Sequence, residues 1–407
     1  MSISVNRRGA VAAGLATALC AAVPALAQKK YDPGVSDTEI VLGMPMPLSG
    51  PVSAYAVVGK VAEAYFNRLN EQGGINGRKV RIVMYDDQYS PPKTVEVARK
   101  MVEQDQVLAI FSPLGTAANA AILRYMNAKK VPHLFVQSGA AQFNDAAKNP
   151  WTVPLLASYQ GEGRVFAHHI LETKPEAKIA VLMQNDDLGR EILKGLQDGL
   201  SKQSKAKVVA QATFEVADPT VDSQLVQLKA SGADVLVMAA TSRTAAQAIR
   251  KTAELGWKAE RYMNYAAAPS KMTFGPAGLE NAKGVIGLQV YKDAGSVRWS
   301  QDPEVVEYLE FLKKYAKDID PKNATASAGY IVAQLMAHVL REAGSEPTRD
   351  GVRRAASNLK NPRIAMNLPG VKMENSSADL HAYASMQLVR FNGEDLDLIG
   401  SAVRTKP

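Results

Sequence analysis

The sequence has a single cysteine, Cys20, among 407 residues, and only five histidines. One cysteine excludes an intramolecular disulfide framework and argues against a thiolate metal site. His168 and His169 are adjacent, so on a helix their side chains diverge by about 100° and cannot bind the same ion. We therefore expect no metal site and no cofactor.

The common catalytic signatures are absent as well. The chain contains no G-x-x-x-x-G-K-[ST], no G-x-G-x-x-G that opens a helix, no H-E-x-x-H and no G-x-S-x-G. The acidic pairs Asp86-Asp87 and Asp186-Asp187 each follow an apolar run. Adjacent residues of an extended segment point to opposite sides, so we interpret both pairs as helix N-caps rather than as acid–base couples. No enzyme class is supported.

The net charge of +8 is mild for this length, and the basic residues are scattered. The densest basic cluster, Arg78-Lys79-x-Arg81, has no interleaved aromatic residues. Nucleic acid is therefore not expected as a partner.

The first 27 residues have the pattern of an export signal. Arg7 and Arg8 precede an uncharged, mostly apolar stretch over residues 9–23, and Ala25-Leu26-Ala27 forms a small-x-small cleavage site. A membrane anchor is the alternative, but Pro24 and the cleavage signature shorten the apolar helix. Cleavage would leave a cysteine-free chain that begins near Gln28, with a net charge of +8 − 2 = +6. The expected location is the periplasm.

Short apolar runs alternate with amphipathic stretches through most of the remaining chain. Strand-like runs at 39–45 and 79–87 flank a helical pattern over 54–70, and a similar alternation begins again at 177–183. Strands separated by helices predict a parallel sheet covered on both faces. Two such series predict an α/β protein with two doubly wound lobes.

The last third of the chain breaks this alternation. Residues 302–316, 325–342 and 348–358 read as consecutive helices, and only 384–391 and 397–403 read as strands. These elements do not make a third α/β domain, so we expect them to be shared between the two lobes.

Small and hydroxylated residues follow several strands of the first series. Since ligands of open α/β sheets bind beyond the carboxyl ends of the strands, where helix N-termini offer free N–H groups, these positions predict a cradle for a carboxylate. The residues concerned are Ser49, Gly50 and Tyr55 after the first strand, Gly115 and Thr116 after another, and Ser138, Gly139 and Ala140 after a third.

The order of several motifs resembles one family. "LSGP" before an amphipathic helix, then "NEQGGINGRKV" and "YDD", with "SPLGTAANAAI" and "QNDDLGREILKGLQDGL" further on, is similar to the leucine/isoleucine/valine-type substrate-binding proteins of ABC transporters. The resemblance implies a type I periplasmic binding protein, in which two lobes joined by three chain crossings close on a ligand. It also implies a membrane permease as partner and a monomeric state.

On this resemblance the first lobe would comprise residues 28–155 and 288–364, and the second 156–287 and 365–407. The chain crossings would lie near 154–158, 284–291 and 361–370. Matching positions to the family implies a carboxylate site at Gly115 and Thr116, and contacts with the α-carboxylate and ammonium at 138–140. The full implied ligand-binding set is Ser49, Tyr55, Leu114, Gly115, Thr116, Ser138, Gly139, Ala140, Tyr159, Asp187, Thr241 and Tyr265.

One position departs from the family. Amino-acid binders usually place an acidic residue after the strand that corresponds to 260–265, where this chain has Tyr265-Ala266-Ala267-Ala268. An ammonium without a partner is costly in a closed cleft. Either Asp187 supplies the charge, or the ligand is an aromatic or aliphatic carboxylic acid without an amine. The expected function is import of a small carboxylate such as a branched-chain amino acid, with a ligand sensor as the alternative.

Overall fold

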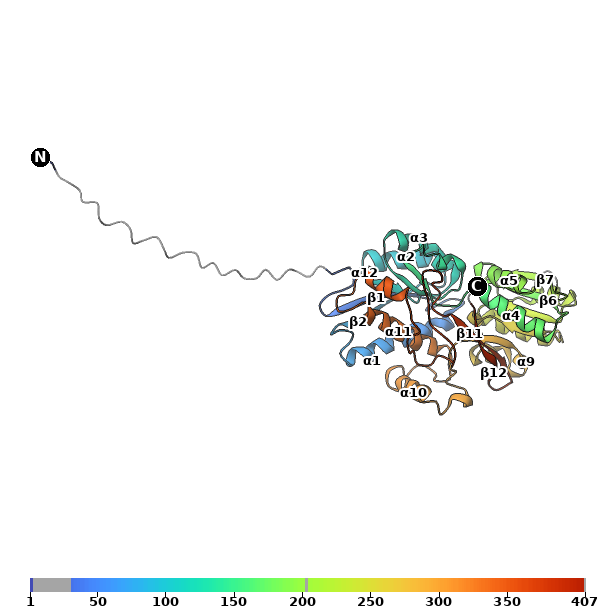
Figure 1. The fold of residues 1–407 in the computed structure, drawn as a ribbon. Helices are drawn as coiled ribbons and strands as arrows, with labels where there is room; N and C mark the ends of the chain where they lie inside the picture. The colour runs from blue at the N-terminus through green and yellow to red at the C-terminus, as the bar shows by residue number, and fades with distance from the viewer. Residues whose placement is uncertain (3–30, 202–203, 406–407) are drawn as a thin grey trace. The chain divides into compact units, whose positions relative to one another are not determined.

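The computed structural model describes residues 1–2, 31–201 and 204–405 (Figure 1). The predicted cleavage site at residue 27 lies outside the described residues. The part that begins at Tyr31 contains two β-sheets. None of the helices in the described ranges is both long enough and apolar enough to cross a membrane.

The first sheet has five parallel strands in the order β2-β1-β3-β4-β5. Helices lie between its successive strands, as the sequence predicts for crossover connections. Its strands are β1 (Glu39–Met46), β2 (Lys79–Asp86), β3 (Ala109–Phe111), β4 (His133–Val136) and β5 (Thr152–Pro154). The helices between them are α1 (Ala56–Glu71), α2 (Pro91–Glu103) and α3 (Thr116–Ala128), with the short 3-10 helices η1 (Ser53–Tyr55) and η2 (Ala141–Asn144).

The second sheet has seven strands in the order β12-β11-β10-β9-β8-β6-β7. The strands β6 to β10 are parallel, whereas β11 pairs antiparallel with both β10 and β12. The strands are β6 (Lys178–Gln184), β7 (Lys207–Phe214), β8 (Val235–Ala239), β9 (Glu260–Met263), β10 (Ile286–Gln289), β11 (Ser385–Phe391) and β12 (Leu396–Arg404). The helices before and between the parallel strands are α4 (Tyr159–Thr173), α5 (Asp187–Gly199), α6 (Asp222–Ala230), α7 (Ser242–Glu254), η3 (Tyr265–Ala267), α8 (Lys271–Ala277) and α9 (Leu279–Ala282).

The chain after β10 forms η4 (Val297–Trp299), α10 (Pro303–Tyr315), α11 (Ala326–Glu342) and α12 (Arg349–Ala356) before it reaches β11. Both α10 and α11 contact α1 of the first sheet, and Figure 1 shows α11 and α12 beside α1 and β1. The rings of Phe311 and Tyr330 pack together, with centroids 4.9 Å apart, and Tyr65 of α1 lies 5.3 Å from Tyr330. These helices therefore pack against the first sheet, while the late strands join the second. The residue boundaries of the two lobes stay a prediction.

Two details of the sequence analysis need correction. Helices α8 and α9 were not expected, because they are short and are broken by Pro276 and Gly278. Asp186 caps α5 as expected, accepting from the N–H groups of Leu188 and Gly189. The pair at residues 86 and 87 does not cap α2, which begins after Ser90 without a side-chain cap.

Instead, those two carboxylates hold the loops beside the first sheet. Asp86 accepts hydrogen bonds from the backbone N–H groups of Leu48, Ser49 and Gln88. Asp87 accepts from the N–H of Tyr89 at 3.0 Å. Asp87 therefore fixes the turn from which the Tyr89 side chain projects.

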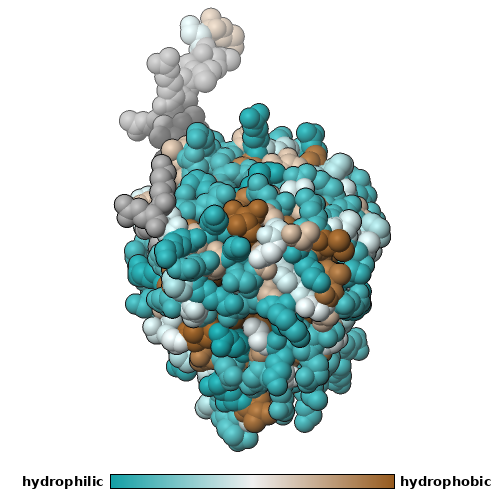
Figure 2. Space-filling view, turned by 90° about the vertical axis from the view of Figure 1, so that its right-hand side faces the viewer, coloured by the Kyte–Doolittle hydropathy of each residue, from teal (hydrophilic) through white to brown (hydrophobic). Residues whose placement is uncertain are grey.

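Figure 2 views the described part from the right-hand side of Figure 1. This face is mostly hydrophilic, and its apolar residues form separate patches rather than one continuous surface. The exposed large apolar side chains of the chain include Val226, Leu279 and Val297. Isolated exposed apolar residues are normal for globular proteins, so this face gives no sign of a large apolar interface.

Candidate functional site

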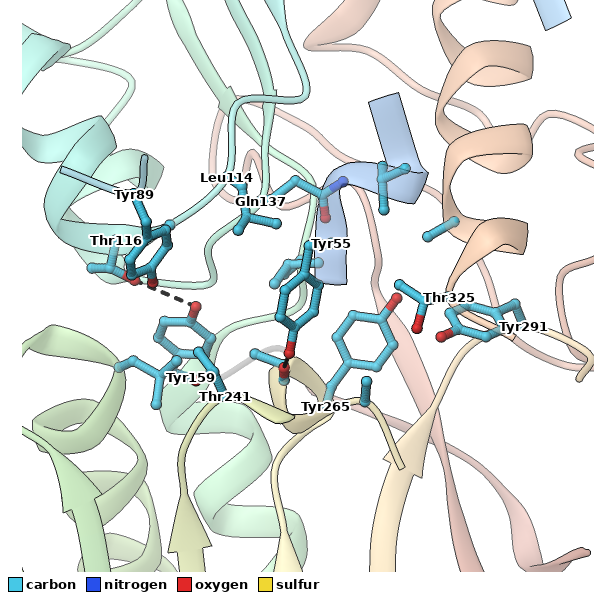
Figure 3. Close-up of a pocket in the computed structure, with 17 residues that line it drawn as sticks. Tyr55, Tyr89, Leu114, Thr116, Gln137, Tyr159, Thr241, Tyr265, Tyr291 and Thr325 are labelled. Atoms are coloured by element: carbon cyan, nitrogen blue, oxygen red, sulfur yellow. Dashed lines mark hydrogen bonds between the residues drawn. The ribbon is translucent and has the colours of Figure 1, made fainter. Parts of the chain in front are cut away.

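A pocket lies where the carboxyl ends of strands from both sheets come together (Figure 3). Its empty volume is about 590 Å³, including space at its open mouth. The 17 lining residues are Tyr55, Val58, Tyr89, Leu114, Gly115, Thr116, Gln137, Leu156, Tyr159, Leu188, Thr241, Tyr265, Ala266, Ala268, Tyr291, Thr325 and Ala328.

Tyrosine rings form much of the wall. They come from distant parts of the chain: Tyr55 from η1, Tyr89 from the loop after β2, Tyr159 from the start of α4, Tyr265 from η3 and Tyr291 from the segment after β10. The rings of Tyr265 and Tyr291 meet edge to face, 6.2 Å apart. Burial raises the pKa of all these hydroxyls above the ordinary value. They are therefore neutral hydrogen-bonding groups at physiological pH.

The Tyr55 hydroxyl connects elements that belong to different sheets. It donates a hydrogen bond to the carbonyl oxygen of Ala266, 2.7 Å away, and accepts one from the N–H of Ser242 at 3.0 Å. Figure 3 shows the Tyr55 ring extending across the pocket toward η3. This side chain thus closes one side of the pocket.

The polar end of the pocket is the start of α3. Gly115 precedes this helix with φ +98°, and α3 has no side-chain cap. The first N–H groups of a helix have no partner within it, so those of Thr116 and Ala117 point from a positive helix end. The Thr116 hydroxyl lies 2.9 Å from that of Ser138 and 3.4 Å from that of Tyr159.

Only glycine fits at residue 115. A Cβ built there would lie 2.3 Å from Cε2 of Tyr89, far inside van der Waals contact. The positive φ is also unfavourable for any residue with a side chain. The absence of a side chain therefore lets the Tyr89 ring pack against the start of α3.

None of the described residues that line the pocket carries a formal charge. The fully buried carboxyl of Glu162 lies behind the wall, where it accepts a hydrogen bond from the N–H of Tyr265 at 2.9 Å. Burial raises the pKa of Glu162 to about 8. This group is therefore mostly neutral at pH 7 and does not line the pocket.

The structure brings some of the predicted site residues together and leaves others outside the pocket. Ser49 is held by Asp86, with 2.6 Å between its hydroxyl and the carboxylate. Ser138 is buried behind Thr116, and a Cβ on Gly139 would meet the carbonyl oxygen of Ala157 at 2.0 Å. The predicted residues that line the pocket are Tyr55, Leu114, Gly115, Thr116, Tyr159, Thr241 and Tyr265; those that do not are Ser49, Ser138, Gly139, Ala140 and Asp187.

Asp187, the candidate partner for a ligand amine, lies outside the pocket lining. Its carboxylate is 2.8 Å from the guanidinium of Arg190, one turn further along α5. It also accepts a hydrogen bond from the side-chain amide of Gln142 at 2.6 Å. The negative charge of Asp187 is thus already paired.

The sequence analysis missed several lining residues. Tyr89 lies two residues after the "YDD" motif, a signal that could have drawn attention to it. Tyr291, Thr325 and Ala328 belong to the segment after β10 and to the beginning of α11, whose return to the first sheet no local pattern reveals. The other missed residues are Val58, Gln137, Leu156, Leu188, Ala266 and Ala268.

Among the described residues, no three His, Cys, Asp or Glu side chains are grouped so that they could hold an ion. The pocket thus offers apolar surface, aromatic rings, hydroxyls and one helix N-terminus. These groups can bind a ligand, but they do not form a nucleophile–base pair.

Known binding proteins resemble this chain in sequence and in fold. The chain is 24% identical over 336 residues to the Leu/Ile/Val-binding protein homolog 1 of Brucella suis, covering 76% of this chain and 84% of the relative. Its fold matches the branched chain amino acid ABC transporter protein of Thermus thermophilus with bound valine, with a TM-score of 0.79, 16% identity and coverage of 91% and 97%. It also matches the fatty acid ABC transporter substrate-binding protein of Thermomonospora curvata, with a TM-score of 0.78, 20% identity and coverage of 92% and 95%.

These structures have the type I periplasmic binding protein fold that the sequence resemblance implies. A sequence profile for the family described as periplasmic binding protein matches residues 39–395, which include every residue of the pocket. This family consists of binding proteins and not of enzymes, and its location is extracytoplasmic. The chain belongs to the periplasmic binding protein family.

Proposed function

We propose that this chain is the substrate-binding protein of an ABC importer and that its pocket takes a small carboxylic acid without an amine. The observation that carries the proposal is the absence of any charged side chain among the described residues of the pocket lining. The body of the ligand would be aromatic or branched aliphatic, to match the tyrosine and leucine side chains.

The start of α3 is the proposed site of the ligand carboxylate. The N–H groups at this end and the Thr116 hydroxyl can donate to carboxylate oxygens, and the helix dipole favours negative charge there. No arginine or lysine is needed for this mode of binding. Valine, which is bound in the Thermus thermophilus structure, and the fatty acids named for the Thermomonospora curvata protein both carry a carboxylate. A carboxylate site therefore agrees with both neighbours.

An amine is disfavoured because the pocket holds no counter-charge. Transfer of an ammonium from water into a closed, uncharged site costs several kcal/mol unless it is paired and hydrogen-bonded. Asp187 is already paired with Arg190, and Glu162 is mostly neutral and separated from the pocket by the backbone of Tyr265 that it binds. The branched-chain amino acids named for several relatives are therefore the less favoured ligands.

The position of the pocket between elements of both sheets supports a role in transport. Ligand binding there would stabilise a closed arrangement, which a membrane permease would recognise. We propose that this chain delivers its ligand to the permease in this way as a monomer, after residues 1–27 have been removed on export.

Isothermal titration of the purified protein with matched ligands tests the proposal. Leucine would be compared with isocaproate and leucate, and phenylalanine with hydrocinnamate and phenyllactate, so that each set differs mainly in the amine. We expect binding of the acids without an amine and at least about a hundredfold weaker binding of the amino acids. Tighter binding of leucine or phenylalanine would refute the proposed ligand class.

The carboxylate site is tested by substitution at Thr116. Thr116→Val removes the hydroxyl and should weaken binding of the best acid about tenfold, the effect of one hydrogen bond to a charged group. Thr116→Ser keeps the hydroxyl and is the matched control, for which we expect affinity near that of the unmodified protein. Equal affinity of the valine variant would place the carboxylate elsewhere.

A further inference from the structure

A second cavity lies beside the pocket, on the other side of the Tyr55 wall. Its empty volume is about 650 Å³, including space open to solvent. One face of α7 forms most of it, and α8 and η1 complete it. Its lining residues are Ala54, Ser242, Arg243, Ala246, Gln247, Arg250, Met272 and Pro276.

The two cavities share a thin wall. Tyr55 and Thr241 line the pocket, whereas their chain neighbours Ala54 and Ser242 line the second cavity. The hydrogen bond from the Ser242 N–H to the Tyr55 hydroxyl, 3.0 Å long, therefore lies at the boundary. Met272 of the second cavity adds to this wall, since it packs against the apolar cluster of Val52, Tyr55 and Ala268.

The charge of the second cavity differs from that of the pocket. Arg243, Gln247 and Arg250 follow the i, i+4, i+7 spacing and so share one face of α7. No acidic residue is among the described residues that line it. The cavity is therefore positive, whereas the adjoining pocket is uncharged.

The positive charge at one end of this face is not neutralised by the protein. Arg243 is exposed and makes no ion pair or hydrogen bond with the residues that the structure describes. Arg250 lies 3.9 Å from Glu254 and also interacts electrostatically with Asp222. By contrast, Lys251 on a neighbouring face of α7 is paired at 3.1 Å with Asp222.

We propose that the second cavity is a subsite for a second negative group of the ligand, so that the preferred substrates are elongated dicarboxylic acids. This inference rests on the proposed function, because it places the first carboxylate at the start of α3. The distal carboxylate would meet Arg243 and Arg250, both of which can donate charge-assisted hydrogen bonds.

Movement of the Tyr55 side chain would open the wall between the two cavities to such a ligand. If the Tyr55 ring turns aside, the Ser242 N–H loses its partner in the first turn of α7. That N–H would then face the distal carboxylate together with the two arginines. A ligand with one carboxylate has no group to replace the Tyr55 hydroxyl there, which leaves the wall closed.

Titration calorimetry with acids of matched length tests the subsite. Hexanoate, octanoate and decanoate would be compared with adipate, suberate and sebacate, and cinnamate with para-carboxycinnamate, at low and high salt. For at least one length we expect the diacid to bind about tenfold more tightly at low salt, with a smaller advantage at high salt.

The variant Arg243→Gln, Arg250→Gln should remove this advantage while leaving the affinity for the monocarboxylates within about twofold of that of the unmodified protein. Lys258→Gln is the matched control, since Lys258 is an exposed cation beyond the opposite end of α7 and should leave the advantage intact. Thermal unfolding of each variant verifies that the fold is retained.

The outcomes separate this inference from the proposed function. Monocarboxylate binding without a diacid advantage at any length would overturn the subsite and leave the proposed function in place. An equal loss for both classes in the double arginine variant would also overturn it, because the arginines would then attract anions without binding the distal group. Failure of every acid to bind would overturn both.

Discussion

Substitution of Gly115 by alanine should weaken ligand binding and also lower the stability of the fold. The new Cβ would lie 2.3 Å from Cε2 and 2.8 Å from Cζ of the Tyr89 ring. Since the backbone at residue 115 begins α3, the half-buried Tyr89 ring is the part that must move, and we expect it to move into the pocket that it lines. The space and the N–H groups available to a ligand would then be reduced together.

Two effects contribute to the loss of stability. A side chain at φ +98° costs about 1 kcal/mol. Displacement of a packed ring adds about 1 to 3 kcal/mol, as for other overpacked sites. We expect the free energy of unfolding to fall by about 2 to 4 kcal/mol and the affinity for the best carboxylic acid to fall at least about tenfold.

Gly73 provides a matched control. Its φ of +100° is close to that of Gly115, but nothing lies within 4 Å of a Cβ built there. Gly73→Ala should therefore lower the free energy of unfolding by about 1 kcal/mol and leave ligand affinity unchanged. Urea denaturation measures the first quantity, and titration calorimetry measures the second.

The comparison between the two variants is decisive. If Gly115→Ala bound the ligand as tightly as the unmodified protein, the Tyr89 ring would have another place to go and the described contact would not shape the pocket. If Gly73→Ala lost affinity to the same extent, backbone strain alone would explain the result, and the reasoning from the Tyr89 contact would fail.

Three further substitutions address other parts of the site. Tyr55→Phe leaves the carbonyl and the N–H that its hydroxyl joins without a partner, so urea denaturation should show a loss of about 1 to 2 kcal/mol; an unchanged midpoint would contradict these bonds. Asp187→Asn should change ligand affinity less than about twofold, because the carboxylate is paired with Arg190 outside the pocket; a large loss in titration calorimetry would show that Asp187 binds the ligand. The raised pKa of Glu162, about 8 against 4.5 for the unperturbed group, means that the folded state holds this proton more tightly than the unfolded state. The contribution of Glu162 to the free energy of unfolding is therefore fully present below pH 4.5. It is lost as pH rises toward about 8, with a slope of up to about 1.4 kcal/mol per pH unit. Glu162→Gln should reduce the slope in urea denaturation measured across this pH range and leave the part due to Glu191 and Asp293, whose pKa values burial raises to about 7 and about 6. An unaltered profile would show that Glu162 does not contribute.

Much of the fold follows from local patterns. The helix expected over 54–70 is α1, and the strand-like runs at 79–87 and 177–183 are β2 and β6, because amphipathic periodicity and flanking turn residues record which face of each element is buried. Boundaries are less well determined: residues 107–111 are all apolar, but the strand β3 covers only Ala109–Phe111. Here pairing with neighbouring strands, rather than apolar character, sets the length.

Only part of the candidate site could likewise be predicted from local patterns. Glycine and hydroxyl residues at strand ends identified Gly115 and Thr116, since a helix N-terminus after a parallel strand has a known place and polarity. Neighbouring residues of the same kind, Ser49 and Ser138, lie outside the pocket lining because they bond Asp86 and Thr116. Sequence spacing does not reveal which hydroxyl faces a ligand and which faces another side chain.

The sequence by itself determined the parallel α/β layers, the family and the lack of an acidic residue after β9. These properties depend on residue types and on short-range periodicity, which are present before the chain folds. The tertiary structure alone decided that Thr325, before α11, reaches the pocket, that the Tyr55 hydroxyl joins η3 to α7, and that Asp187 pairs with Arg190. Such contacts join residues far apart in the chain or select one partner among several, so they exist only once both sheets have formed.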